Sequence, residues 1–460
     1  MPEASRHRFC RRALPRGLAY AGGAHPASLT EFLADKTWVD DEGVRHVEQE
    51  IFDAAFDMID RSHRLVLLDF FLYNDFQGKH PETTRPLSAE LTERLVRRKA
   101  AHPGLRAILI TDPINTVYGS LPSAQFERLR QAGVEVVMSD LRKLRDPNPL
   151  YSVVWRLLFR PLGNSARGWV PSPIGGNRKV TLRSYLEAFN FKANHRKTII
   201  ADCGGDWQAM VTSANPHDAS SAHTNVALRF NGPAVRDLLT SENAVLRFSG
   251  REPVDVPFDT PRQSGAATVQ VLTESAIKAA AIRMIETSRR SERLCVSTFY
   301  LSDRAVVTAL KDAQHRGVAL RLLLDPNKDA FGNPKFGIPN REVAEELARE
   351  GVEIRWAHTH GEQCHTKMIL KETMSGTAEL LAGSANLTRR NLDDFNLETS
   401  VLVRGDASVD PFRKARFNFD VLWYGQPGRH FSVPYEHYRR RSVVRTWLYR
   451  FMEASGFSTW

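Results

Sequence analysis

Two parts of the chain show the same alternation of apolar and polar positions. From Val47 onward, apolar residues at helical spacing precede a largely apolar run at 64–75, and helix and strand patterns then alternate as far as residue 140. The same order begins again at residue 277 and ends at residue 357. Apolar strands that alternate with amphipathic helices predict a sheet covered on both faces. We therefore expect an internal duplication of a β/α unit.

Polar residues at the ends of equivalent strands support this duplication. Asp112-Pro113 in the first part and Asp325-Pro326 in the second both follow an apolar strand. We predict five segments: a basic, irregular arm (1–30), a first half (31–250) with an insertion at about 141–188, a linker rich in Pro, Asp, Gly and Ser (251–268), a second half (269–425) and a basic amphipathic tail (426–460). The insertion is long enough to have a function of its own.

A helix is predicted at residues 150–163 of the insertion. Its apolar side is expected to hold Trp155, Leu158, Phe159 and Leu162. Such a helix either packs on the second half of the protein or dips into lipid. The tail offers the same two alternatives, because arginines accompany apolar residues at helical spacing between Val443 and Met452. It forms the last packed helix of the fold, or it lies on an anionic membrane.

The candidate chemistry of the first half is concentrated within residues 194–225. His195 and Lys197 are two residues apart, so in a strand both side chains point to one side. After a turn, Ser213 and Asn215 follow with the same spacing. A histidine, an ammonium group and two neutral polar groups suit a phosphoryl group, whose oxygens need their charge neutralised. A single pair of this kind is also common on a solvated strand edge.

A second copy of the pattern favours the chemical interpretation. His365 and Lys367 repeat the first pair, and Ser384 and Asn386 repeat the polar residues that follow it. The two spans from histidine to asparagine differ by a single residue. Two chance matches this close are improbable, so we interpret the repeat as one duplicated site.

The paired HxK motifs, each followed by an acidic residue and a G-S-x-N-like tetrad, resemble the phospholipase D superfamily over most of residues 45–425. Asp202 follows the first motif as in that family. Glu372 stands where the family has Asp, which keeps the charge, and Thr212 stands where it usually has Gly. The resemblance implies an α/β fold of two tandem phospholipase D-like α/β/α sandwich halves, related by a pseudo-twofold axis, with one shared active site.

The resemblance also implies a reaction through a phosphohistidine at the interface of the two halves. One histidine attacks phosphorus, and the other protonates the leaving alcohol. The implied catalytic residues are His195, Lys197, Asp202, His365, Lys367, Glu372 and Glu398, and the implied substrate-binding residues are Ser213, Asn215, Ser384 and Asn386. The acids after the HxK motifs are mainly ion-pairing groups in the family. Two lysines replace the usual cation, so we expect no metal and no cofactor.

The attacking histidine is predicted from the residues beyond each tetrad. Asn225-Val226-Ala227 is aligned with Asn396-Leu397-Glu398, so only the second half keeps a carboxylate there. In several family members the second-half acid supports the first-half histidine. The resemblance therefore makes His195 the nucleophile, Glu398 its orienting partner and His365 the general acid. The alternative is that Glu398 is an ordinary surface residue.

Composition narrows the choice of partners. The chain has 460 residues, a formal net charge of +10 and a pI near 9.5, which imply an anionic partner, either an acidic membrane surface or nucleic acid. No apolar run approaches the roughly 20 residues that span a bilayer, and the start of the chain does not read as a secretory signal. The expected location is the cytoplasm, peripheral to the inner face of the cell membrane.

The substrate is implied by the overall plan of the chain and by the aromatic segment Phe70–Asp75, which resemble bacterial cardiolipin synthases. This resemblance implies transfer of a phosphatidyl group from phosphatidylglycerol to a second alcohol, or hydrolysis of the same lipids. The alternatives are a phosphodiesterase or nuclease acting on DNA or RNA, and a scaffold without activity that binds anionic lipid. A monomer suffices for the active site, because both motifs lie in one chain.

Overall fold

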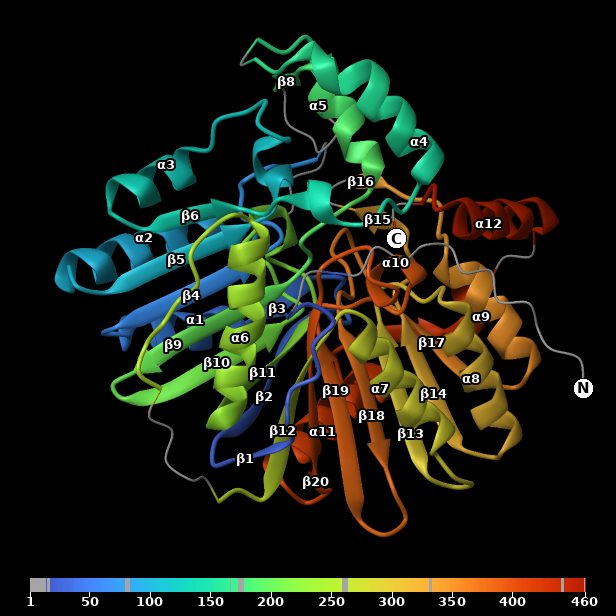
Figure 1. Ribbon diagram of the computed structural model, residues 1–460. Helices are drawn as coiled ribbons and strands as arrows, with labels where there is room; N and C mark the ends of the chain where they lie inside the picture. Colours follow the sequence, from blue (N-terminus) through green and yellow to red (C-terminus); the bar gives the residue numbers. More distant parts are fainter. Residues whose placement is uncertain are drawn as a thin grey trace, which may run out of the picture.

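Each half of the chain builds one large mixed β-sheet (Figure 1). The computed structural model describes residues 14, 17–78, 83–165, 167–172, 178–258, 264–330, 333–439, 442–458 and 460. The strand order of the first sheet is β3 (Arg45–Glu48), β2 (Thr30–Val39), β11 (Asn225–Asn231), β10 (Asp206–Thr212), β9 (Lys197–Cys203), β4 (Leu65–Phe70), β5 (Arg106–Thr111) and β6 (Glu135–Met138). The strand order of the second is β1 (His25–Ala27), β12 (Ala267–Thr273), β20 (Thr399–Asp406), β19 (Thr377–Gly383), β18 (Lys367–Glu372), β13 (Arg293–Thr298), β14 (Ala319–Leu324), β17 (Glu353–Ala357) and β21 (Ser432–Pro434).

The strands from β2 to β6 in the first sheet have counterparts in the same order from β12 to β17 in the second. In each sheet three strands are parallel, namely β4, β5 and β6 in one and β13, β14 and β17 in the other. The strand that begins with the motif lysine, β9 or β18, joins them antiparallel. The predicted α/β class and its internal duplication are confirmed.

Helices cover the outer face of each sheet (Figure 1). They are α1 (Ile51–Asp60), α2 (Leu87–Ala101) and α3 (Ala124–Gln131) in the first half, and α7 (Ser275–Glu286), α8 (Arg304–His315) and α9 (Asn340–Arg349) in the second. The predicted apolar side of α1 is the buried one, with Ile51, Phe52 and Ile59 among its buried residues. Burying one such side chain contributes about 1.5–3 kcal/mol, which is why these helices stay on the sheets.

Two further helices lie between the sheets. Helix α6 (Pro233–Phe248) belongs to the first half and contacts β12, whereas α11 (Asp410–Tyr424) belongs to the second half and contacts β2. One apolar cluster includes Phe230 of β11, Val401 of β20 and Phe412 of α11. Because this core is built by both halves, it holds the strand ends that carry the two motifs at a fixed distance from each other.

Strands occur in both terminal segments. Residues 25–27 form β1, which pairs with β12, so the prediction of an irregular arm is wrong for these residues. Residues 1–13, 15 and 16 of that arm lie outside the described residues. Strand β21 of the predicted tail pairs with β17. Edge strands attach through backbone hydrogen bonds, and no side-chain pattern in the sequence indicates them.

The helix predicted at 150–163 is broken into three pieces. Helix α4 (Pro149–Val154) is followed by a π-turn (Trp155–Phe159) and by a 3-10 turn (Arg160–Leu162). The π-turn changes the helical register, so Trp155 is buried while Leu158 and Leu162 are exposed. The predicted apolar side is therefore wrong. The segment packs on α5 (Leu182–Glu187) of the same insertion, with the Tyr151 hydroxyl donating to the Leu186 carbonyl at 2.6 Å.

Candidate active site

His195 and His365 lie where the two halves meet. The backbone N–H of His195 donates to the Leu397 carbonyl at 2.8 Å, and that of His365 donates to the Thr224 carbonyl at 2.8 Å. Each histidine is thus fixed by the half that does not carry it. This exchange of backbone hydrogen bonds brings both motifs to one place, as expected for a shared site.

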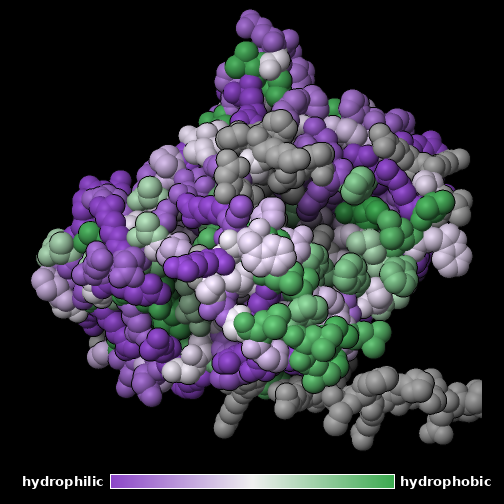
Figure 2. Space-filling model, turned by 90° about the horizontal axis from the view of Figure 1, so that it is seen from above, coloured by the Kyte–Doolittle hydropathy of each residue, from purple (hydrophilic) through white to green (hydrophobic). Residues whose placement is uncertain are grey.

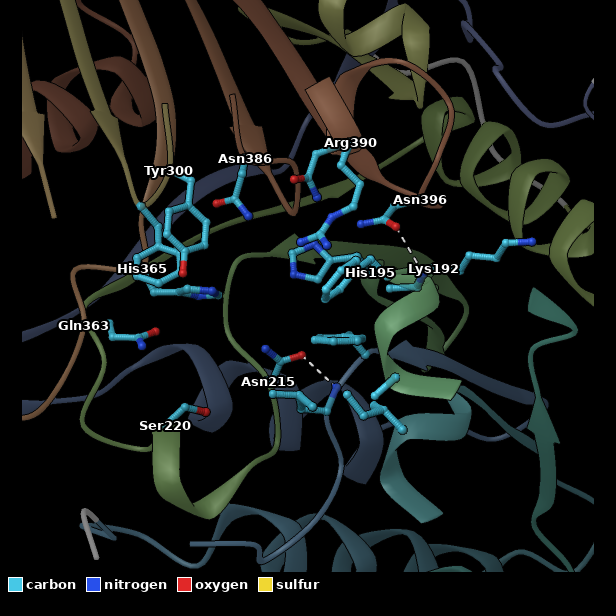
Figure 3. Close-up of a pocket in the computed structure, with 18 of the residues that line it drawn as sticks. Lys192, His195, Asn215, Ser220, Tyr300, Gln363, His365, Asn386, Arg390 and Asn396 are labelled. Carbon is cyan, nitrogen blue, oxygen red and sulfur yellow. Dashed lines mark hydrogen bonds between the residues drawn. The ribbon is translucent and has the colours of Figure 1, made fainter. Parts of the chain in front are cut away.

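Both histidines line one cavity of about 240 Å³. Asn215 and Asn386 line it as well, and Figure 3 shows these four side chains facing the same space from the two halves. The Leu72 N–H donates to Oδ1 of Asn215 at 3.1 Å, which leaves the amide NH₂ group of Asn215 to donate to a ligand. Within the described residues, Oδ1 of Asn386 has no hydrogen-bond partner.

The His195 ring is held by Glu398. Nδ1 of His195 lies 2.9 Å from Oε1 and 3.1 Å from Oε2 of Glu398, which is fully buried. The Ser384 hydroxyl donates to Oε2 at 2.5 Å, and the Asn391 amide donates to Oε1. Glu398 is therefore not a surface residue. Ser384, predicted to bind substrate, instead holds this carboxylate behind the histidine.

Nδ1 of His365 faces a side-chain amide, whereas Nδ1 of His195 faces a carboxylate. Nδ1 of His365 lies 3.2 Å from Oδ1 of Asn225, and the Ser213 hydroxyl donates to the same oxygen at 2.9 Å. Asn225 is thus the counterpart of Glu398, and the alignment of Asn225 with Asn396 is wrong by two residues. The loop before β20 is longer than the loop before β11, and the spacing of the motif residues does not reveal this difference.

The electrostatic state of the His195–Glu398 pair follows from its burial. Burial lowers the pKa of His195 to about 4, although Glu398 acts in the opposite direction. Burial alone would raise the pKa of Glu398, but contact with His195 brings it below its usual value. At neutral pH the pair is an ionised carboxylate beside a neutral imidazole. An imidazole that donates from Nδ1 keeps a lone pair on Nε2, which is the atom able to attack phosphorus.

Lys197 and Lys367 lie behind the histidines. Nζ of Lys197 donates to the His195 carbonyl at 2.6 Å, and Nζ of Lys367 donates to the His365 carbonyl at 2.9 Å. Neither lysine is among the residues that line the cavity. Burial lowers the pKa of Lys197 to about 7, and burial together with Lys197 lowers that of Lys367 well below its usual value. Without an anion, the cavity therefore disfavours positive charge.

Anion binding is expected to draw protons into this cavity. Lys197 has a pKa of about 7, so it is about one-tenth protonated at about pH 8. A bound phosphate raises the pKa of a neighbouring ammonium group, so net proton uptake is expected at about pH 8, and the share from Lys197 should be smaller at about pH 6, where this lysine is already charged. Isothermal titration of inorganic phosphate in buffers of different ionisation enthalpy measures this uptake. Equal heats in all buffers at the higher pH would contradict the prediction.

Arg390 is the candidate functional residue that sequence reasoning missed. Arg390 comes shortly after Asn386 in the sequence and lies on the short helix α10 (Arg389–Leu392). It lines the cavity and reaches into it from the second half (Figure 3). One guanidinium nitrogen donates to the Ser458 carbonyl at 3.1 Å, while Nε has no partner among the described residues. Burial lowers the Arg390 pKa to about 10, so it stays charged at neutral pH. Arg390 is half-buried and has no carboxylate ion-pair partner among the described residues, which suits a site that receives an anion.

Asp202 and Glu372 do not reach the cavity. Asp202 lies at the other end of β9 from Lys197, roughly 16 Å away at about 3.3 Å per strand residue, and accepts hydrogen bonds from the backbone N–H groups of residues 63–65. Glu372 ends β18 and pairs with Arg416 at 2.7 Å. Their position contradicts a catalytic role and agrees with the ion-pairing role that the resemblance implied.

Replacing Asp202 by alanine is expected to lower the free energy of unfolding and to leave kcat of the folded protein unchanged. The carboxylate is buried, and its removal leaves the backbone N–H groups of His63, Arg64 and Leu65 without their acceptor. The free energy of unfolding should fall by about 2 kcal/mol. Chemical denaturation measures the loss, and activity per folded molecule serves as the second readout. A large fall in kcat of the folded variant would contradict this prediction.

The described residues contain neither a cluster suited to a metal ion nor a helix able to span a membrane. Among them, we find no group of three or more His, Cys, Asp or Glu side chains arranged to hold a metal ion. The same residues include no helix with the length and apolar character needed to cross a bilayer.

Comparison with known proteins gives results that agree with this geometry. Residues 281–423 match the family model described as "Cardiolipin synthase, PLD-like domain". The chain is 24% identical over 440 residues to a cardiolipin synthase of Geobacillus kaustophilus, which covers 92% of this chain and 72% of that protein. It is 26% identical over 395 residues to cardiolipin synthase A of Pseudomonas fluorescens, covering 79% and 67%.

A solved structure shares the fold. Phosphatidylserine synthase of Haemophilus influenzae aligns with a TM-score of 0.55 at 9% identity, covering 93% of this chain and 94% of that one. The duplicated fold and the two HxK histidines in one cavity are the features of an enzyme that uses a pair of histidines. The chain is therefore similar to cardiolipin synthases, and its residues 281–423 match their phospholipase D-like domain.

Proposed function

We propose that this chain is a phosphatidyltransferase that acts on phospholipid phosphodiesters in the manner of a cardiolipin synthase. The observation that carries the proposal is the unequal pair of histidines in one cavity, His195 on the carboxylate of Glu398 and His365 on the amide of Asn225. A carboxylate stabilises the cationic phosphohistidine, and an amide does not. The cardiolipin synthases among its relatives favour lipid over nucleic acid as the substrate.

In the first step, Nε2 of His195 attacks phosphorus of phosphatidylglycerol and forms a P–N bond while the P–O bond to glycerol breaks. His365 gives a proton to the departing glycerol oxygen. Burial, and then the positive charge of Lys367, hold the pKa of His365 well below its usual value, and the charge of a bound phosphodiester raises it. His365 thus gains its proton when substrate is present.

In the second step, an alcohol attacks the phosphohistidine. His365, now neutral, takes the alcohol proton, the new P–O bond forms, and the P–N bond to His195 breaks. Asn215, Asn386 and Arg390 donate to the nonbridging oxygens, and Lys197 and Lys367 support their charge from behind. A hydroxyl of a second phosphatidylglycerol as acceptor gives cardiolipin, and water gives phosphatidic acid.

Arg390→Gln is expected to weaken substrate binding. A hydrogen bond from a charged group contributes about 1.5–3 kcal/mol, so the Kd for inorganic phosphate and the KM for lipid should rise by roughly 10- to 100-fold. The neighbouring Arg389 is a matched control, because it donates to the Glu453 carbonyl and does not line the cavity. Equal binding by the Arg390→Gln and Arg389→Gln variants would show that Arg390 does not contact the anion.

The test of the proposed function uses purified protein, phosphatidylglycerol vesicles and EDTA, with a His195→Ala control and lipid chromatography of the products. Cardiolipin formed only by the intact protein supports a transferase, and phosphatidic acid in its place makes the enzyme a hydrolase. No conversion by the intact protein overturns the proposal for this lipid, and other headgroups and single-stranded DNA are then the substrates to test. We further propose that the enzyme works from the cytoplasm on the inner face of the cell membrane.

A further inference from the structure

Exposed apolar side chains gather on two helical segments near the cavity. On α12 (Val443–Ser455) they are Val444, Trp447, Leu448 and Phe451, which share one helical face. On α4 and the turns that follow it they are Leu150, Val153, Val154, Leu157, Leu158 and Leu162. Figure 2 shows hydrophobic patches on the upper face of the molecule, over the region where Figure 1 places α4 and α12. Isolated surface leucines are ordinary, whereas grouped ones indicate an interaction surface.

The α12 segment is joined to the rim of the active-site cavity. The ring of Phe457 packs edge-on against Phe191 at 5.7 Å between centroids, and the Ser458 carbonyl accepts a hydrogen bond from Arg390. Phe191 and Arg390 both line the cavity. The buried Tyr449 fixes the opposite side of the helix by donating to the Ser302 carbonyl at 3.3 Å. The helix is therefore a packed part of the fold that presents its apolar face outward.

The α4 segment is joined to the same rim from the other side. The Tyr151 hydroxyl donates a hydrogen bond to the Leu186 carbonyl, and the Arg183 guanidinium donates to the Arg160 carbonyl at 3.3 Å. The chain then continues from α5 into Ala188, Phe191 and Lys192, which line the cavity. The two apolar segments thus reach the cavity from opposite ends of the sequence, and they meet near Pro147 and Gly456.

Basic residues are in excess along both segments, with Asp146, Glu187 and Glu453 at their borders. Residues 150–186 include six basic residues and no acidic one: Arg156, Arg160, Arg167, Arg178, Lys179 and Arg183. Residues 437–452 include five arginines and no acidic residue. Among the described residues, Arg160, Arg167, Lys179 and Arg445 make no ion pair with a carboxylate. Apolar faces bordered by cations match the chemistry of an anionic lipid surface.

We propose that the α4 segment and α12 together form a docking surface for an anionic lipid bilayer, with the active-site cavity opening between them. Amphipathic helices of this kind enter roughly 5–10 Å into the headgroup region, so a lipid phosphodiester reaches the histidines without leaving the membrane. The choice of a bilayer as occupant rests on the proposed lipid substrate and on the excess of positive charge along both segments. A protein partner would have to match two separate apolar faces and leave the cavity between them open.

The test measures vesicle binding apart from turnover. The variants are Leu157→Glu with Leu158→Glu, and Trp447→Glu with Phe451→Glu, all at side chains more than 60% exposed. The matched control is Met374→Glu, which is 76% exposed on the hairpin at the far end of β18 from the cavity. Co-sedimentation with phosphatidylglycerol vesicles and with phosphatidylcholine vesicles measures binding, and turnover of dispersed short-chain phosphatidylglycerol measures the site.

We expect wild-type protein, Met374→Glu and the inactive His195→Ala variant to bind anionic vesicles alike. Each double variant should bind about tenfold more weakly or worse, a loss of about 1.4 kcal/mol, and should keep its turnover of dispersed lipid within about twofold, since these side chains lie outside the cavity. Binding of the double variants equal to wild type overturns the inference. So does a wild-type dimer that the double variants dissociate, because the faces would then bind a second copy.

The two proposals fail in different arms of this experiment. If the wild-type protein turns over no lipid but the double variants alone lose vesicle binding, the docking surface stands and the proposed function falls. If lipid is turned over while wild-type protein ignores anionic vesicles, the function stands and the docking surface falls.

Discussion

His195→Ala is expected to lower kcat by about 10⁴-fold or more, because the variant has no atom to form the phosphorus–nitrogen bond. The ring of His195 lies in the cavity with Nδ1 on Glu398, so alanine removes the nucleophile and leaves the neighbouring contacts of Ser384 with that carboxylate in place. Turnover is stopped, the stability of the labelled phosphoprotein in acid and in base is measured, and the labelled residue is mapped to locate the intermediate. Phosphate trapped on His365 in the wild-type enzyme would reverse the assignment of the two histidines.

The role of His365 can be separated from that of His195 by the leaving group. A general acid matters less as the pKa of the departing alcohol falls. His365→Asn should therefore be strongly impaired with phosphatidylglycerol but should form the phosphohistidine at a near-normal rate from a nitrophenyl phosphodiester. His195→Ala should be inactive with both substrates. A His365→Asn variant that fails equally with both would contradict a general-acid role.

Glu398→Gln is expected to lower kcat by about 10²- to 10⁴-fold, with a smaller effect on KM. The substitution keeps the shape of the side chain. It removes the negative charge that faces Nδ1 of His195 at 2.9 Å. The imidazole then loses both its fixed orientation and the stabilisation of the cation formed on attack. Pre-steady-state measurement of phosphohistidine formation shows whether the first step is the one that slows.

Two variants serve as controls for Glu398→Gln. Glu372→Gln removes an acid of the same half that pairs with Arg416 away from the cavity, and its kcat per folded molecule should stay near wild type. Asn225→Ala removes the amide on His365 and should cost less than Glu398→Gln, because an amide carries no charge to stabilise a cation. If the glutamine variant kept full activity, Glu398 would have only a structural role.

The pattern of apolar positions predicts the sheets and outer helices because those elements depend on local periodicity. Helix α1 buries Ile51 and Phe52 as its spacing requires, and β4 and β13 are buried almost throughout because helices and a second layer cover both of their faces. The duplicated HxK pattern likewise predicts which histidines share a cavity. Each motif begins a strand in the same position of an equivalent sheet, so one copy predicts the place of the other.

The roles of the residues around those histidines depend on contacts between distant parts of the chain. The sequence shows Arg389 and Arg390 side by side, and only the packing of α10 sends Arg390 into the cavity and Arg389 toward Glu453. The partner of His365 is Asn225, as the register of β11 determines, whereas the spacing of the motifs aligned Asn225 with Asn396.

The surface of the protein also depends partly on residue order and partly on contacts between distant parts of the chain. The alternation of apolar and basic residues in the tail and in the insertion is a property of residue order. The packing of the folded chain turns Tyr449 and Trp155 inward and leaves Trp447 and Leu157 exposed. The physical reason is that a periodic pattern fixes which residues share a face, whereas burial of that face depends on whether another part of the chain is there to cover it.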